Sequence, residues 1–224
     1  MFPQDCGATC AAGPQSQYFS CPLAGCAPIL VAVGQQVANP VAAFPSDNNG
    51  SQIQLPPVVT GGSQTAQGSL IFGIGTQANN GLAGATVYGV NGPGTNAGSF
   101  TSTFNNVAYP GTVSSGANAN FFLTGGITGF PACNAPGYYC PGTVQTASVT
   151  NAGTNGTSGT VTLSIDNGDS LLSSGNFAFS SLAGPGGNRT SGFVFGLPFF
   201  YGRTVFTALS GASTPGGAGP FFAY

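Results

Sequence analysis

Few side chains in this sequence could carry out acid, base or nucleophilic chemistry. It contains no histidine, and its formal net charge is −2. The charged residues are four aspartates and two arginines: Asp5, Asp47, Asp166, Asp169, Arg189 and Arg203. The lack of histidine excludes a Ser/His/Asp triad and an imidazole-bearing metal site. Two arginines cannot hold a phosphate backbone, so we expect no nucleic-acid partner, and we expect no cofactor either.

Six cysteines are the other reactive side chains. They form three close pairs along the chain, namely Cys6 with Cys10, Cys21 with Cys26, and Cys133 with Cys140. An even number of cysteines in local pairs favours small disulfide-closed loops and an oxidising compartment, although six cysteines allow 15 pairings. No CxxC motif occurs and no histidine accompanies the cysteines, so we expect no metal site.

The cysteines favour an exported protein, although the start of this sequence carries no export signal. The opening residues MFPQDC have neither a basic region nor an apolar region of a signal peptide. No stretch approaches the roughly 18 apolar residues that a membrane span needs. We therefore expect a protein that is extracytoplasmic by ancestry, with no signal peptide in this chain and no membrane span.

The composition indicates one all-β domain. Charged residues make up 3% of the chain and hydrophobic residues 41%, alongside 38 glycines and 17 prolines. Short strands joined by glycine and asparagine turns account for this combination, because a disordered chain would be less hydrophobic. We expect a Cys/Gly/Pro-rich N-terminal segment at 1–28 and a single all-β domain at 29–224, with few or no long helices.

Apolar patterns predict where the strands lie. The segment FVFGLPFFYGRTVFTAL at 193–209 predicts two short buried strands joined by a tight bend. The segment TVTLSI at 160–165 alternates, which places Val161, Leu163 and Ile165 on one face of a strand. The run GSLIFGIG at 68–75 predicts a central strand.

Turn signals complete the pattern. Asp47-Asn48-Asn49-Gly50 predicts a hairpin turn between a strand at 41–44 and a return strand at 51–55. Asp166 to Asp169 predicts another tight turn, because Asp and Asn followed by Gly tolerate positive φ.

In order, these elements resemble the C-terminal lobe of pepsin-like aspartic proteases. GSLIFG (68–73), ATVYGV (85–90) and SFTSTFNNV (99–107) resemble that lobe's first three strands, and Phe193-Val194-Phe195-Gly196 resembles the strand that threads behind the catalytic turn in a ψ-shaped loop. Over nearly its whole length the chain resembles an uncharacterised bacterial family that carries aspartic-protease-like motifs and ends much like GLPFFYGRTVFTALSGASTPGGAGPFFAY.

This resemblance puts the catalytic turn at Val113-Ser114-Ser115-Gly116, with Ser114 at the position of the acid. Aspartic proteases use two carboxyl groups that share one proton, one from each lobe. A serine hydroxyl cannot replace the base without a partner base, and this sequence has no histidine or lysine. The resemblance also places the first Asp-Thr-Gly upstream of Met1, in an N-terminal lobe that is missing here. We therefore expect no catalytic residue, and a degenerate motif at Ser114, Ser115 and Gly116.

Two other candidates for catalysis are weaker. Asp166 follows a strand, but Asp166-Asn167-Gly168 is better explained as a hairpin turn. Ser114 and Ser115 could form a nucleophilic pair, but a hydroxyl-lined loop is the simpler interpretation.

We expect a non-catalytic, truncated lobe of an exported bacterial protein, and therefore no enzyme. One alternative is a structural or adhesive β protein of low charge, and another is a peptide-binding or endopeptidase remnant that needs a partner lobe. The expected partners are a missing N-terminal lobe or a peptide, together with self-association through exposed apolar edges.

Overall fold

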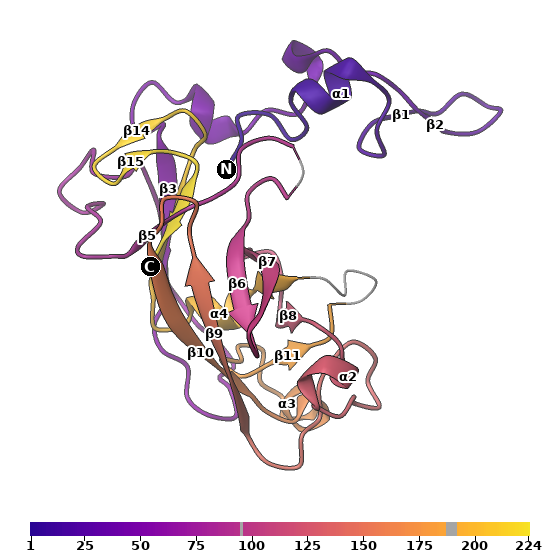
Figure 1. The fold of residues 1–224 in the computed structure, drawn as a ribbon, viewed down its shortest axis with the longest axis vertical. Coiled ribbons are helices and arrows are strands. Elements are labelled where there is room, and N and C mark those ends of the chain that lie inside the picture. Colours follow the sequence, from indigo (N-terminus) through magenta and orange to yellow (C-terminus); the bar gives the residue numbers. More distant parts are fainter. Residues whose placement is uncertain (95, 187–191) are drawn as a thin grey trace.

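The fold is all-β. The computed structural model describes residues 1–94, 96–186 and 192–224, so Arg189 lies outside the described residues. Two larger sheets and two small two-stranded sheets make up most of the regular structure (Figure 1). The longest α-helix among the described residues, α3, has 6 residues. The prediction of an all-β fold with few or no long helices is confirmed.

The elements follow one another in many short pieces. The helical elements are α1 (Ala8–Ala12), the 3₁₀ turns η1 (Val33–Gln35) and η2 (Pro40–Ala43), α2 (Gly125–Thr128), α3 (Gly168–Ser173) and α4 (Leu197–Phe200). The first strands are β1 (Phe19–Ser20), β2 (Ala27–Pro28), β3 (Gly50–Gln54), β4 (Ser69–Phe72), β5 (Val87–Gly89), β6 (Phe100–Phe104), β7 (Val107–Val113) and β8 (Asn120–Phe122). The later strands are β9 (Gln145–Ala152), β10 (Ser158–Ile165), β11 (Ala183–Gly184), β12 (Phe193–Phe195), β13 (Thr204–Ala208), β14 (Ser213–Thr214), β15 (Gly217–Ala218) and β16 (Phe221–Ala223).

The two larger sheets bring together segments that lie far apart in the sequence. The seven-stranded sheet has the order β10-β9-β6-β7-β12-β8-β11. The five-stranded sheet has the order β4-β3-β13-β16-β5, and β3 pairs antiparallel with β13 from Gly50 opposite Ala208 to Gln54 opposite Thr204. The five-stranded sheet therefore combines β3, which starts at Gly50, with strands from the C-terminal end of the chain.

Aromatic side chains dominate the main core. Its fully buried members include Phe100, Phe122, Phe193, Phe195 and Phe199. The rings of Phe122 and Phe193 stack with centroids 5.2 Å apart and an interplanar angle of 5°. Burying several large rings at one place supplies much of the hydrophobic driving force that a chain with so few charges needs.

The segment that the sequence singled out as core is buried, with one difference. Two strands form as predicted, β12 and β13, but the helical turn α4 replaces a simple bend between them. Pro198 stands at the start of α4, where a missing N–H costs nothing, and this placement favours the helical turn.

Three local predictions are wrong. Residues 41–44 were expected to form a strand, but Pro40–Ala43 is a 3₁₀ turn, because the Asn39 side chain accepts a hydrogen bond from the Val41 N–H and Pro40 starts the turn. β3 therefore forms without that hairpin partner. The expected central strand at 68–75, β4, pairs only with β3 and lies at a sheet edge.

The third wrong prediction concerns Asp166 to Asp169. They do not close a hairpin, because Asn167 caps helix α3 by accepting a hydrogen bond from the Ser170 N–H at 3.0 Å. An asparagine side chain serves equally well as a turn former and as a helix N-cap, and here the helix prevails.

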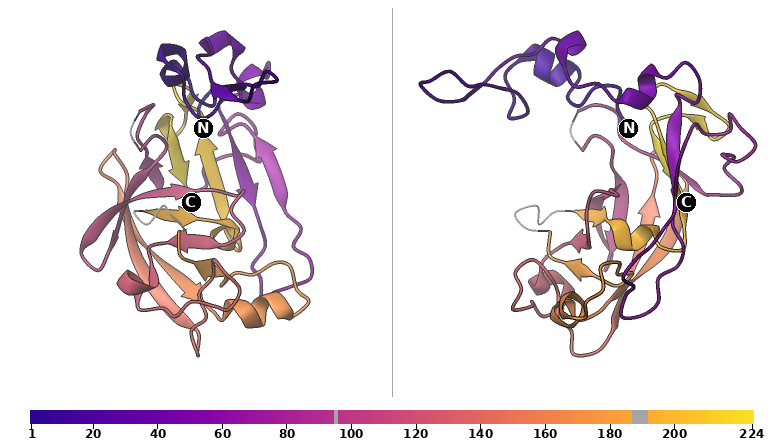
Figure 2. Two further views of the ribbon diagram at one scale, coloured as in Figure 1. Left: turned by 90° about the vertical axis from the view of Figure 1, so that its right-hand side faces the viewer. Right: turned by 180° about the vertical axis from the view of Figure 1, so that it is seen from behind.

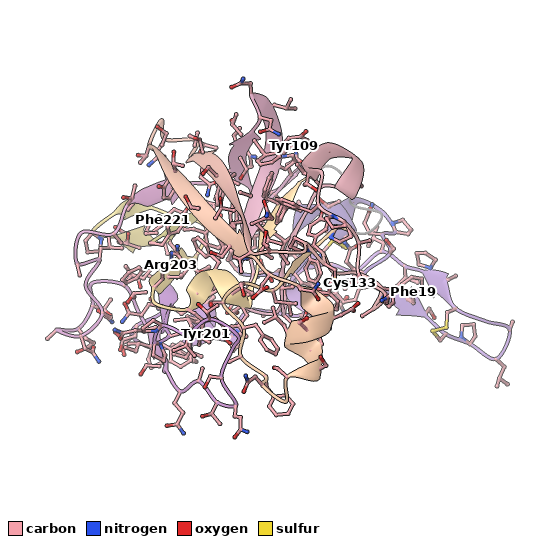
Figure 3. The ribbon with its side chains drawn as sticks, turned by 90° about the horizontal axis from the view of Figure 1, so that it is seen from below. Phe19, Tyr109, Cys133, Tyr201, Arg203 and Phe221 are labelled. Carbon is pink, nitrogen blue, oxygen red and sulfur yellow. A yellow bond between two sulfur atoms is a disulfide. The ribbon has the colours of Figure 1, made fainter. Side chains whose placement is uncertain are left out.

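Residues 6–30, called the arm below, extend away from the two sheets (Figures 1 and 2). The arm contains α1 and the β1–β2 pair. Phe19 lies on the arm between the sheets and the tip, as Figure 3 shows, and is 48% exposed. The arm thus contributes little to the core.

Candidate functional site

Strand β12 lies between β7 and β8 in the seven-stranded sheet. These three strands, with the loop from Ser114 to Ala119 and Gly196, are called the crossing below. β12 pairs parallel with β7, with Phe193 opposite Gly111 and Phe195 opposite Val113. β12 also pairs antiparallel with β8, with Phe193 opposite Phe122. A strand from late in the chain therefore lies between two antiparallel strands that follow one another in the sequence.

Hydrogen bonds tie the loop between β7 and β8 to the end of β12. The Ser114 N–H donates to the Phe195 carbonyl at 2.9 Å, and the Leu197 N–H donates to the Ala117 carbonyl at 2.7 Å. The Gly196 N–H donates to Asn120 Oδ1 at 2.9 Å. The residues of the expected degenerate motif and of the expected threading strand thus lie side by side.

Gly196 makes the closest backbone approach at this crossing. A Cβ atom built on Gly196 would lie 2.0 Å from the Ala119 carbonyl oxygen and 2.8 Å from the Ala117 carbonyl oxygen. Both obstacles are main-chain atoms, so no side chain can move aside. Only glycine fits here, and the reason is lack of space, since the backbone φ of −84° is ordinary.

Asn120 is a structural residue of the crossing that the sequence analysis does not single out. It is 2% exposed, and its side-chain oxygen holds Gly196 in place. A polar residue directly before the apolar residues 121–123 was the available signal, because buried polar side chains are retained where they make hydrogen bonds.

Ser114 is half-buried, while Ser115 and Gly116 are exposed. In the part of the chain that the structure describes, no side-chain hydrogen bond reaches the hydroxyl of Ser114 or Ser115, so neither has a base to activate it. This loop presents hydroxyl groups and main chain, and no activated nucleophile.

The four aspartates lie at three places in the fold, because Asp166 and Asp169 both stand at the start of helix α3, and each aspartate accepts hydrogen bonds of its own. Asp169 accepts from the Asn134 and Ala135 N–H groups at 3.1 and 3.0 Å, and Asp166 accepts from its neighbour Asn167 at 2.7 Å. Asp5 accepts from the Tyr18 hydroxyl at 2.5 Å, and Asp47 accepts from the Thr76 hydroxyl. Each carboxylate has its own hydrogen-bond donors, and no two of them form the pair that acid–base proteolysis requires.

Two pockets flank the crossing, and Thr112 lines both of them. The larger, of about 620 Å³, is lined by residues of β7, β8 and β12 with neighbouring loops, including Pro110, Phe121 and Val194. The smaller, of about 380 Å³, includes Ser114, Ser115 and Phe222. No charged side chain lines either pocket among the described residues, although Met1, which carries the α-amino group, lines the smaller one.

Arg203 has a structural role beside the core. Its Nη1 donates to the Phe199 carbonyl at 2.7 Å, and its guanidinium carbon lies 4.6 Å from the centre of the Phe199 ring. Burial lowers the pKa of Arg203, and burial raises the pKa of the nearby Tyr201 hydroxyl. Figure 3 shows both residues at the turn around α4.

The cysteines form three disulfides, each within one of the close pairs: Cys6–Cys10, Cys21–Cys26 and Cys133–Cys140. Asp169 lies near Cys133 and Cys140, but those sulfurs are bonded to each other and its carboxylate accepts main-chain N–H groups. This group is therefore a cross-linked turn. Within the described ranges, no helix has the length and apolar character to cross a bilayer.

Comparison with known proteins places the chain in one family. A family model described as "Protein of unknown function (DUF3443)" matches residues 1–224, so the chain belongs to this family. A search of curated proteins found no match. The expectation of an uncharacterised family is confirmed, whereas neither comparison supplies an aspartic protease as a relative.

Proposed function

We propose that this member of the family is a non-catalytic lobe of the aspartic-protease type. One observation carries the proposal. β12 runs between β7 and β8, and Gly196 packs against the loop that begins at Ser114. This connectivity resembles the ψ-shaped loop that supports a catalytic aspartate in pepsin-like lobes, and in the proposed correspondence Ser114 takes the position of the acid.

The chemistry of position 114 supports the absence of peptide hydrolysis. An aspartic protease needs one carboxylate to activate water and a second carboxyl group to protonate the substrate carbonyl. Ser114 supplies neither group, and the four aspartates are engaged in other turns. The chain therefore keeps the supporting scaffold of such a site without its reacting groups.

The same proposal assigns the domains and the compartment. Residues 29–224 form the lobe, and residues 1–28 are the segment that leads into it. Three disulfides in a chain of this size support an extracytoplasmic location, because short cytosolic disulfide loops are kept reduced.

The test is an assay of peptide hydrolysis at acid pH, with and without pepstatin, on the oxidised protein. We expect no cleavage above the buffer blank and no shift in melting temperature with pepstatin. Cleavage that pepstatin blocks would overturn the proposal. The variant Ser114→Ala is the matched control, because cleavage that is lost in this variant would instead assign a nucleophile to Ser114 and also contradict the proposal.

A further inference from the structure

β10 forms one edge of the seven-stranded sheet. It is 8 residues long and pairs only with β9, in unbroken antiparallel register from Ser158 opposite Ala152 to Ile165 opposite Gln145. Figure 1 shows it as a long strand at the left of the molecule. Its Val161, Leu163 and Ile165 are buried, whereas Ser158, Thr160, Thr162 and Ser164 are exposed.

The register identifies the main-chain groups that point outward. At the end of the hairpin, the Gly153 N–H donates to the Thr157 carbonyl at 2.8 Å, so that pair is hydrogen-bonded across the two strands. Because such pairs alternate, Gly159, Val161, Leu163 and Ile165 bond to β9, and the alternate residues direct their N–H and C=O groups away from it. The 3.2 Å contact between the hydroxyls of Thr150 and Thr160 agrees, because side chains approach most closely in the alternate pairs.

No device that usually protects a sheet edge is present on β10. The strand contains no proline, no charged residue and no bulge, and no main-chain hydrogen bond from another described segment reaches residues 158–164. The other edges are shorter. β4 has 4 residues and β11 has 2, and β5 is covered by Asn155, which bonds to both Gly89 and Val87.

We propose that β10 pairs antiparallel with β10 of a second copy of this chain, about a two-fold axis at Val161. In this register Thr160 lies opposite Thr162 of the second copy, and Ser158 lies opposite Ser164. Every N–H and C=O group between residues 158 and 164 that points away from β9 then has a hydrogen-bond partner in the second copy. On the exposed face, the serine and threonine hydroxyls of the two copies lie next to one another.

The second copy is the occupant because the strand is complementary to itself. An isologous interface requires that one surface fit its own image, and 158–164 carries hydroxyl residues at both ends of one face without any charge that would repel its image. A single edge contact buries less than a standard interface of about 1,600 Å², so the dimer is weak and reversible.

Cysteine cross-linking tests the register. Paired residues that bond through the main chain lie about 5.5 Å apart, within the reach of a disulfide, whereas diagonal neighbours at about 7–8 Å are not. We expect Thr160→Cys mixed with Thr162→Cys to give a covalent dimer on mild oxidation, and each variant alone to give little. All six native cysteines are already paired, so the added thiol is the reactive one. No dimer in the mixture, or an equal yield from either variant alone, overturns the proposal.

Sedimentation of charge variants tests the edge without cross-linking. Thr162→Lys places a charge beside the second copy, and we expect it to raise the dimer dissociation constant at least about tenfold. Ser148→Lys is the matched control, because Ser148 lies opposite Thr162 on the same exposed face, one strand further in. We expect it to leave dimerisation unchanged at an equal melting temperature. A wild-type chain that stays monomeric at about 100 μM, an equal effect of both variants, or β10 occupied by a different protein's strand would contradict the proposal.

Discussion

The crossing and the arm show two ways of fixing an almost uncharged chain. At the crossing, Phe193 and Phe195 are 2% and 0% exposed, and the main chain passes with no space to spare at Gly196. In the arm, Phe19 is 48% exposed and Leu23 lies fully in solvent, and two disulfides close loops whose cysteines are 4 and 5 positions apart. Burial holds the first region, whereas local disulfides and hydrogen bonds, such as that from Gln36 Nε2 to the Gly7 carbonyl, hold the second.

The difference shows how a protein with few charged residues stabilises its segments. No ion pair links the described residues, so a segment here needs either many buried apolar contacts or a cross-link to offset its conformational entropy. We therefore expect the crossing to set the global stability and the arm to open without unfolding of the sheets.

The largest expected effect is at Gly196. The variant Gly196→Ala would place a methyl group 2.0 Å from the Ala119 carbonyl oxygen, so we expect a loss of about 3 kcal/mol or more, or no folded protein. Gly116→Ala is the matched control in the same loop, because its Cβ would meet nothing nearer than 3.9 Å. Urea unfolding of both variants checks this. Similar stability of the two would show that the crossing is looser than described.

The next effect is at Phe193. The variant Phe193→Ala removes a ring that stacks on Phe122 and lies between Phe195 and Tyr109, so we expect a loss of about 3–5 kcal/mol. Phe177→Ala, at a ring that is 80% exposed, should change the free energy of unfolding by about 0.5 kcal/mol at most. A large effect at Phe177 would mean that the sheets do not contain the dominant core.

The smallest effects come from the disulfides, which compare the arm with a turn that packs on helix α3. Replacing Cys133 and Cys140 by serine frees a turn against which Gly168 packs, and we expect a loss of roughly 2–3 kcal/mol. Replacing Cys21 and Cys26 by serine should cost less than about 1 kcal/mol globally, because the arm opens by itself.

Urea unfolding and amide hydrogen exchange separate these outcomes. Faster exchange should stay within residues 6–30 for the arm variant. If removing Cys21–Cys26 destabilised the sheets as much as removing Cys133–Cys140, the arm would unfold together with the sheets as one cooperative unit.

Local sequence patterns correctly predicted features that depend only on neighbouring residues. The alternation of Thr160 to Ile165 gives β10 and its buried face correctly, because a period of two residues is the direct result of strand geometry. The same patterns failed at 41–44 and at Asp166 to Asp169, where one asparagine side chain decides between strand, turn and helix.

Local sequence patterns cannot predict which strands pair when they lie far apart in the sequence. Nothing in the apolar run at 68–75 distinguishes an edge strand from a central one, because this depends on how many strands flank it. The neighbours of β12 were expected through a family resemblance alone, and the role of Asn120 escaped notice, because its hydrogen-bond partner Gly196 is remote in the sequence.

The position of β12 in the chain constrains how this protein is made. β7 and β8 end by residue 122, yet the strand that must lie between them comes at 193–195, and β3 likewise awaits β13. Neither large sheet can close until nearly all of the polypeptide has left the ribosome or the translocation channel. High contact order of this kind makes folding slow and leaves unpaired strands exposed meanwhile, so chaperone protection during synthesis should raise the yield of native protein.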